Sequence, residues 1–361
     1  MAYNRKQRLN DNIKAIETAF ILDREQRTPT ARERLLLERY CGFGGLKCIL
    51  NPARELADAV HWAKSDLELF APTVELHRLI RENSKNESEY KQLMDSLKQS
   101  VLTAFYTPSA VTEALTDVLK EHQIIPEKVL EPSAGIGAFV DSVLDNNPKA
   151  DIMAFEKDLL TGKILRHLHP EQKVRIEGFE KIEKPFNDYF DLAISNIPFG
   201  DVAVFDPSYT AMKGMRALVT RRIHNYFFVK ALDTVRDGGL VAFITSQGVL
   251  NAKNNSAARF MMLYHADLVS AIRLPNNLFT ENANTEVGSD LIILQKNSQK
   301  ESLRGDDNLL DTVYNDENRI PTNNYFLEHP ERIIHTTAKL DTDPFGKPAM
   351  IYTHEDGVEG I

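Results

Sequence analysis

Short apolar runs that end in glycine, proline or polar residues recur along the middle of this chain. Each has the length of a buried strand, and stretches with helical spacing of apolar residues lie between them. The predicted strands cover residues 129–130, 151–156, 173–178, 192–194, 238–246, 268–274 and 290–295. This alternation predicts an α/β fold with a doubly wound, mostly parallel sheet of seven strands, the last two forming an antiparallel pair at one edge. An amphipathic helix is expected over 224–235.

The N-terminal region has a helical pattern instead. Apolar residues spaced three and four apart predict helices over 12–20, 31–41, 55–70 and 88–98. The glycine-rich stretch 41–47 interrupts them, either as a tight turn between helices or as a surface that nucleic acid approaches. The chain is therefore expected to divide into a helical region 1–100 with a DNA contact, an α/β domain 101–298 and an acidic tail or linker 299–361.

The strand at 192–194 leads into the sequence Asn196-Ile-Pro-Phe. The Asn196 side-chain oxygen accepts hydrogen bonds, and Pro198 stiffens the turn so that the Ile197 carbonyl can serve as a second acceptor. The Phe199 ring offers a flat face for stacking. Together these residues predict a clamp for a planar NH2 group. The alternative is an ordinary turn from strand to loop with a buried phenylalanine.

A glycine-containing turn follows the strand at 129–130. Gly135 and Gly137 allow the backbone to turn tightly before a helix, as in nucleotide-binding turns, although the third glycine position holds Val140. Glu131 at the strand end disfavours a pyrophosphate and suits a ligand that carries an ammonium group. Glu156 ends the next strand, at the spacing expected of a residue that binds ribose hydroxyls.

A helix start is expected at Thr107 and Pro108, with Thr107 as the N-cap and Pro108 as the first helical residue. The free backbone N–H groups there favour a carboxylate, so an amino-acid-like ligand would fit. The alternative is a well-capped helix without a ligand.

Composition sets broad limits on this protein. Its 361 residues, 42% hydrophobic and 26% charged, suit a soluble globular chain of about two domains. No apolar run approaches the roughly 18 residues of a membrane span, and the N-terminus lacks a secretory signal. The two cysteines, Cys41 and Cys48, are too few for a disulfide framework or a zinc site. We expect a cytoplasmic protein without a metal or a membrane partner.

The net charge of −9 is unevenly distributed. Residues 300–361 hold 6 basic and 13 acidic side chains, whereas 207–232 hold 5 basic and no acidic ones. The basic residues of that segment are Lys213, Arg216, Arg221, Arg222 and Lys230. A basic loop directly after the clamp predicts a path for a phosphate backbone, and the alternative is a solvated surface segment.

The order of these motifs resembles the gamma-type adenine-N6 DNA methyltransferases, which include the modification subunits of restriction systems. The resemblance rests on Phe-Tyr-Thr-Pro at 105–108, Glu-Pro-Ser-Ala-Gly-x-Gly-x-Phe at 131–139, the strand-end Glu156 and Asn-x-Pro-Phe at 196–199. It covers roughly 101–298. The stretch 40–46 further resembles methylase–helicase proteins of conjugative elements and phages.

The resemblance implies a class I, Rossmann-like methyltransferase fold with S-adenosyl-L-methionine as cofactor. Glu131 would lie near the cofactor's amino group, Glu156 with Lys157 near its ribose, and Glu180 near its adenine. The implied contacts to its methionine end are Tyr106, Thr107, Pro108, Pro132, Ser133, Gly135 and Gly137.

The implied substrate is an adenine flipped out of DNA, held by Asn196, Ile197, Pro198 and Phe199 as catalytic residues. Lys213, Arg216, Arg221 and Arg222 would contact the DNA. A specificity subunit or a helicase domain of a longer protein would be a further partner, since the tail is too short for a target-recognition domain. We expect only a short helix near 309–313 there.

Two positions depart from the family pattern. Ile197 replaces the usual proline of the clamp, and Gly178 stands where an acid usually precedes the aromatic residue Phe179, a role that Glu180 would take over. Two alternatives therefore stay open. One is a protein-glutamine methyltransferase with the same clamp, and the other is a catalytically silent DNA-binding or antirestriction module.

Overall fold

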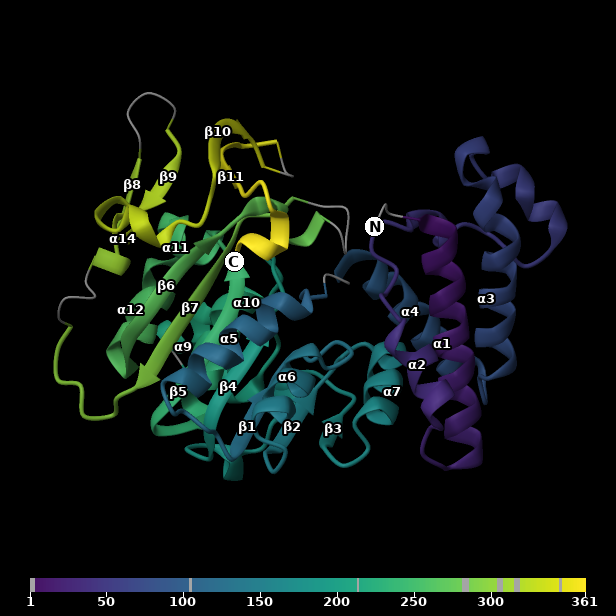
Figure 1. The fold of residues 1–361 in the computed structure, drawn as a ribbon, viewed down its shortest axis with the longest axis horizontal. Coiled ribbons are helices and arrows are strands. Elements are labelled where there is room, and N and C mark those ends of the chain that lie inside the picture. Colours follow the sequence, from purple (N-terminus) through teal and green to yellow (C-terminus); the bar gives the residue numbers. More distant parts are fainter. Residues whose placement is uncertain are drawn as a thin grey trace.

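The computed structural model describes residues 4–103, 106–212, 214–280, 286–303, 308–314, 319–343 and 346–361. A bundle of helices lies beside an α/β domain, with α7 (Leu159–Leu168) at the contact between them (Figure 1). No helix among the described residues is long and apolar enough to cross a membrane.

The helical region is built around α1, whose inward face is fully buried. Its helices are α1 (Arg5–Glu25), α2 (Ala31–Glu38), α3 (Phe70–Glu82) and α4 (Glu87–Thr103), with short 3-10 turns η1 (Lys47–Leu50), η2 (Leu56–His61) and η3 (Lys64–Leu69). Thr30 starts α2 with a capping box, because its hydroxyl accepts from the Glu33 N–H while the Glu33 carboxylate accepts from the Thr30 N–H.

The helix predicted over 55–70 is wrong. Those residues form η2 and η3, and α3 begins only at Phe70, so the helix over 70–82 was missed. Leu56 and Val60, which suggested a helical apolar face, are each 82% exposed. The Asp58 carboxylate also accepts from the backbone N–H groups of Arg54 and Glu55, which closes a short turn rather than extending a helix.

The glycine-rich stretch 41–47 is a turn packed inside the helical region, the first of its two alternatives. Gly42 and Gly45 take φ angles of 67° and 77°. Phe43 and Leu46 are fully buried, and Asn12 donates from its side-chain amide to the Gly42 carbonyl at 2.6 Å. The glycines therefore serve the backbone conformation of a buried connection.

The predicted seven-stranded, mostly parallel sheet is confirmed. Its order is β3-β2-β1-β4-β5-β7-β6, and β7 alone runs in the opposite direction to the other six strands of this sheet. The strands are β1 (Lys128–Glu131), β2 (Asp151–Phe155), β3 (Lys173–Arg175), β4 (Phe190–Asn196), β5 (Val235–Ser246), β6 (Ala266–Leu274) and β7 (Ser289–Lys296). β3 ends at Arg175, three residues before the predicted end at 178.

Two cores cover the two faces of the sheet, because successive strand residues point to opposite sides. On β4, Leu192 and Ile194 pack with α5 (Ser109–Glu121) and α6 (Ala138–Asn146), whereas Ala193 packs with α10 (Ile223–Thr234) and α12 (Ser256–His265). α10 is buried on all sides between the sheet and its neighbours α9 (Met215–Val219) and α12, so the predicted amphipathic helix is corrected to a core helix.

The acidic tail is folded onto the α/β domain. It contains the hairpins β8 (Thr312–Tyr314)–β9 (Pro321–Asn323) and β10 (Thr337–Thr342)–β11 (Pro348–Thr353), and the short helix α14 (Asn324–Glu328). The strand at 312–314 replaces the helix predicted near 309–313. The Asn323 amide donates to the carbonyls of Leu250 and Leu309, and β8–β11 lie together beyond one end of the sheet strands (Figure 1). This segment is therefore not a free linker.

Candidate active site at the carboxyl edge of the sheet

The strand order reverses between β1 and β4, and ligands of doubly wound folds bind at such a switch point. Glu131 ends β1, Glu156 follows β2, and Asn196 ends β4. Because β1 pairs in parallel with both β2 and β4, these three polar residues reach the same edge of the sheet. The fold thus gathers residues that stand up to 65 positions apart in the sequence.

The clamp residues 196–199 are held by neighbouring elements. The Ile197 N–H donates to the Ile244 carbonyl of β5 at 3.0 Å, and the Ile197 side chain is 1% exposed. The isoleucine side chain thus packs into the core of the domain. The half-buried Phe199 ring packs edge to face with Phe279, 6.5 Å between centroids. Ile197, which stands where the family usually has proline, is therefore accommodated by packing its side chain in the core.

Glu156 fastens the turn after β1. Its carboxylate accepts from the Gly135 N–H at 2.8 Å and from the Asp158 N–H at 2.7 Å. Gly135 and Gly137 have φ angles of 58° and 98°. A Cβ on Gly135 would lie 2.8 Å from the Tyr106 ring, so the backbone approach requires glycine there.

Glu131 is 2% exposed, and its Oε2 atom has no hydrogen-bond partner among the described residues. Burial raises the pKa of Glu131 well above its ordinary value, and the nearby acids Glu156 and Asp141 raise it further. An unpartnered buried carboxylate oxygen is costly, and a cationic ligand group would satisfy it. This orphaned acceptor fits the ammonium group of an amino-acid-like cofactor.

The Glu180 carboxylate lies beside Gly178. Its Oε1 atom is 2.5 Å from the position that a Cβ on Gly178 would take, so the side chain occupies the space beside Gly178. The exposed Lys157 reaches the same carboxylate at 4.0 Å. The glycine at 178 therefore makes room for the acid two residues later.

The start of α5 differs from its prediction by one residue. Pro108 occupies the N-cap position and Ser109 is the first helical residue, and no side-chain cap forms. Pro108 borders a cavity of about 460 Å³ that is also lined by Leu278, Glu355 and Val358. Of the other predicted contacts, Pro132 is buried, and the Ser133 carbonyl accepts from the Ser195 hydroxyl at 3.4 Å.

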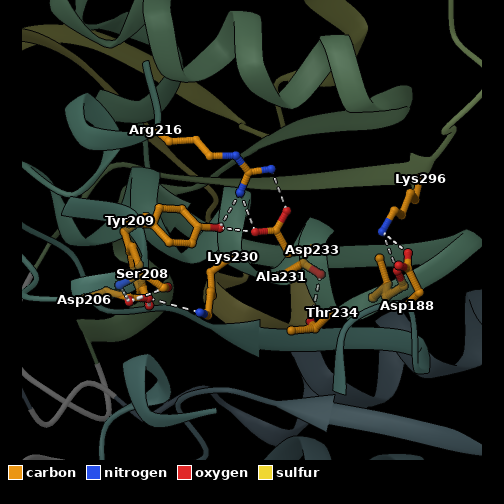
Figure 2. Close-up of polar contacts among 12 residues, drawn as sticks. Asp188, Asp206, Ser208, Tyr209, Arg216, Lys230, Ala231, Asp233, Thr234 and Lys296 are labelled. Atoms are coloured by element: carbon orange, nitrogen blue, oxygen red, sulfur yellow. Dashed lines mark hydrogen bonds and ion pairs between the residues drawn. The ribbon is translucent and has the colours of Figure 1, made fainter. Parts of the chain in front are cut away.

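The basic loop is largely neutralised by carboxylates of the same chain. Arg216 donates to Asp233 at 2.6 Å, and the buried Lys230 pairs with Asp206 at 3.0 Å (Figure 2). Arg222 pairs with Asp201 at 2.8 Å, whereas Arg221 is exposed and has no carboxylate partner among the described residues. Lys213 lies outside the described residues.

The acids of these pairs lie just beyond the segment that the charge count covered. Asp206 and Asp233 immediately flank 207–232, so a count over that segment misses them. Asp206 also accepts from the Tyr226 hydroxyl at 2.7 Å. The segment predicted as a basic loop therefore contains α9 and most of α10, and ion pairs hold Arg216 and Lys230 on these helices.

Burial, followed by the charge of Asp158, raises the pKa of Glu156 from its ordinary value of 4.5 to about 8. The folded chain therefore holds this proton more tightly than the unfolded chain, and the resulting stability is lost as the pH rises from 4.5 through 8. We expect Glu156→Gln to lessen the fall in unfolding free energy between pH 5 and pH 8, by up to about 1.4 kcal/mol per pH unit. Urea titrations at several pH values measure the unfolding free energy of the wild type and of Glu156→Gln. The exposed Glu121→Gln is the control, and parallel pH curves for Glu156→Gln and wild type would contradict it.

The strand order, the glycine turn after β1 and the carboxylate after β2 define the class I methyltransferase fold. Within that class, the family profile described as N-6 DNA Methylase matches residues 88–351. The chain belongs to this family. The match begins in α4 and ends in β11, beyond both boundaries of the expected domain 101–298.

Two curated proteins are similar to parts of the chain. The "Defense against restriction protein B" of Escherichia phage P1 is 29% identical over 201 residues, covering 54% of this chain and 8% of that protein. The "Type II methyltransferase M.XamI" of Xanthomonas campestris pv. amaranthicola is 25% identical over 173 residues, covering 44% of this chain and 33% of that protein. The chain thus spans a third or less of the length of these relatives.

Solved structures are similar at low identity. A modification subunit of a putative type I restriction enzyme from Vibrio vulnificus YJ016 has a TM-score of 0.46 at 15% identity, covering 80% of this chain and 67% of the other. A putative class I S-adenosylmethionine-dependent methyltransferase from Listeria monocytogenes has a TM-score of 0.47 at 15% identity, covering 83% of this chain and 91% of the other.

Proposed function

We propose that this chain transfers a methyl group from S-adenosylmethionine to the exocyclic N6 of adenine in DNA. The observation that carries the proposal is the position of Asn196-Ile-Pro-Phe at the carboxyl end of β4, beside Glu131 and Glu156, in a member of the N-6 DNA methylase family. An acceptor for an NH2 group and a set of carboxylates suited to the cofactor share one edge of the sheet.

The residues 196–199 act by holding the base. The Asn196 side-chain oxygen and the Ile197 carbonyl accept from the two N–H bonds of the adenine NH2 group, and Phe199 stacks on the ring. Two acceptors favour a pyramidal nitrogen, which frees its lone pair for attack. The new C–N bond forms as the C–S bond breaks, and the nitrogen then loses a proton to water. Positioning supplies most of the rate, so no strong base is required.

The carboxylates hold the cofactor, which supplies an electrophilic methyl group when bound. The buried Glu131 accepts from its ammonium group, since the Oε2 atom has no hydrogen-bond partner in the part of the chain that the structure describes. Glu156 binds the ribose hydroxyls next to the backbone of Gly135, and Glu180 lies on the adenine side with Lys157. The methionine end of the cofactor contacts Tyr106, Thr107 and Pro108.

The proposed partner is DNA, and further partners come from a longer protein or a separate subunit. The chain covers only 8% and 33% of its curated relatives, which leaves room for helicase or specificity segments elsewhere. We expect little sequence specificity from this chain alone, because its tail folds onto the sheet rather than forming a separate DNA-reading domain.

Transfer of a labelled methyl group tests the proposal directly. The chain is incubated with methyl-labelled S-adenosylmethionine and, in parallel, with duplex DNA or with glutamine-containing peptides. We expect label in DNA, recovered as N6-methyladenine by mass spectrometry. Label on glutamine instead would support the protein methyltransferase alternative. Cofactor binding without any transfer would support the silent module.

Arg221→Ala tests the phosphate path. We expect weaker binding to DNA of any sequence and a salt dependence whose log–log slope falls by about 1, as for one lost phosphate contact. Fluorescence anisotropy across a salt series measures both quantities. Lys149→Ala is the control. Lys149 is an exposed cation just before β2, at the amino ends of the parallel strands and so away from the proposed site. An unchanged slope of the salt dependence in Arg221→Ala would show that Arg221 is an ordinary solvated residue that makes no phosphate contact.

A further inference from the structure

Through α4, the helical region contacts the α/β domain next to the proposed cofactor site. Ser96 is 6% exposed, and its hydroxyl donates to Asp158 Oδ2 at 2.5 Å while accepting from the Leu160 N–H at 3.0 Å. The other Asp158 oxygen accepts from the Thr161 N–H at 2.7 Å and so caps the start of α7. One serine of the helical region thus holds both the capping carboxylate and the first turn of α7.

The hydrogen bonds continue from Asp158 into the proposed cofactor site. The Asp158 N–H donates to Glu156 Oε1 at 2.7 Å, and Glu156 Oε2 accepts from the Gly135 N–H at 2.8 Å. The carboxylate proposed to bind the ribose is therefore aimed by the backbone of Asp158. That backbone is held in turn by the bond from Ser96 to the Asp158 side chain.

A second line of contacts ends at the same glycine. The Thr161 hydroxyl donates to the Tyr40 oxygen at 3.4 Å and lies 3.3 Å from the Tyr106 oxygen. The rings of Tyr40 and Tyr106 are 6.3 Å apart, and Tyr106 packs against Gly135. α1, α2 and α4 all contact α7 on this side of the domain (Figure 1).

We infer that the helical region keeps the cofactor pocket in its binding shape, with Ser96 as the positioning residue for Glu156 and Tyr40 as support for Tyr106. The inference rests on the proposed function, since it concerns affinity for S-adenosylmethionine. Without the Ser96 hydroxyl, the half-buried Asp158 carboxylate and the Leu160 N–H both lose a partner. The start of α7 then relaxes, and Glu156 loses its fixed orientation.

Ser96→Ala is expected to weaken S-adenosylmethionine binding about tenfold, the effect of losing hydrogen bonds around a charged group. At saturating cofactor, kcat and the KM for DNA stay near the wild-type values, because Ser96 contacts neither the base nor the DNA. Ser96→Thr, which keeps the hydroxyl, is expected to restore affinity. Tyr40→Phe, a milder change, is expected to weaken binding less than Ser96→Ala.

Thr73→Ala is the matched control. Thr73 is a fully buried hydroxyl on α3 of the same helical region, and it donates to the Leu69 carbonyl within that region. Thermal unfolding of each variant measures the loss of stability, and calorimetry with S-adenosylmethionine measures the affinity. We expect both alanine variants to lower the melting temperature, and only Ser96→Ala to lower the affinity.

The possible failures are separable. A wild-type chain that does not bind S-adenosylmethionine would overturn the proposed function and the inference with it. A wild-type chain that binds, with Ser96→Ala and Tyr40→Phe each within twofold of it, would overturn the inference alone. An equal loss of affinity in Thr73→Ala and Ser96→Ala would also overturn it, since general destabilisation would then explain the effect.

Discussion

Asn196→Ala is expected to lower methyl transfer to DNA by about 10²–10³-fold or more, the scale of losing one oriented hydrogen-bonding group that acts on the reacting atoms. The residue ends β4 at the carboxyl edge, and its side-chain oxygen is the proposed acceptor for the adenine NH2 group. Without that acceptor the nitrogen stays conjugated with the ring and is poorly aimed. Initial rates with labelled cofactor measure the effect.

The affinity for S-adenosylmethionine separates this role from a structural one. In the proposed clamp Asn196 binds the base and not the cofactor, so calorimetry on Asn196→Ala is expected to give a dissociation constant within about threefold of wild type, less than one lost hydrogen bond. Asn187→Ala, an exposed asparagine just before β4, is the control and should retain full transfer. An Asn196→Ala variant that methylates at half the normal rate would exclude Asn196 from the clamp.

Asp290→Ala is expected to lower the free energy of unfolding by about 3–5 kcal/mol, because it leaves a buried guanidinium without its counter-charge. Asp290 is fully buried on β7, and its carboxylate accepts from Arg273 of β6 at 2.9 and 3.1 Å. Arg273 also lies 4.2 Å from the centre of the Phe326 ring and donates to Asn251. The pair thus joins the antiparallel edge of the sheet to the tail.

Urea unfolding followed by circular dichroism measures that loss. Asp95→Ala is the control, since Asp95 pairs with Lys98 on the exposed side of α4 and such surface pairs contribute little. We expect the control to unfold near the wild-type midpoint. An Asp290→Ala chain within about 1 kcal/mol of wild type would show that the buried pair is not a major source of stability.

The predictions that proved accurate came from short contiguous patterns. Apolar runs that end in turn residues identified all seven strands of the sheet, because a buried strand requires several neighbouring apolar residues. The antiparallel pairing of β7 with β6 was also predicted, because large doubly wound sheets commonly carry antiparallel strands at one edge. Gly135 and Gly137 were singled out as residues that allow a tight backbone turn, and both have positive φ angles in the structure.

The predictions that failed depended on burial and on distant partners. Leu56 and Val60 have helical spacing, yet both lie in solvent and η2 forms instead. The charge count over 207–232 left out Asp206 and Asp233, which lie just outside it and pair with Lys230 and Arg216 in the folded chain. The path for DNA along this segment stays a prediction. Spacing and charge counts do not report which side chains meet.

By itself the sequence determined the fold class, the order of the motifs and the chemistry of the residues at the strand ends, since these follow from local periodicity and residue type. The tertiary structure alone decided which of those groups share an environment. Only folding buries Glu131 with a carboxylate oxygen that has no hydrogen-bond partner among the described residues, and only folding joins Ser96 of α4 to Asp158. These contacts span up to 62 positions, and no local pattern encodes them because they depend on how the helices and strands pack.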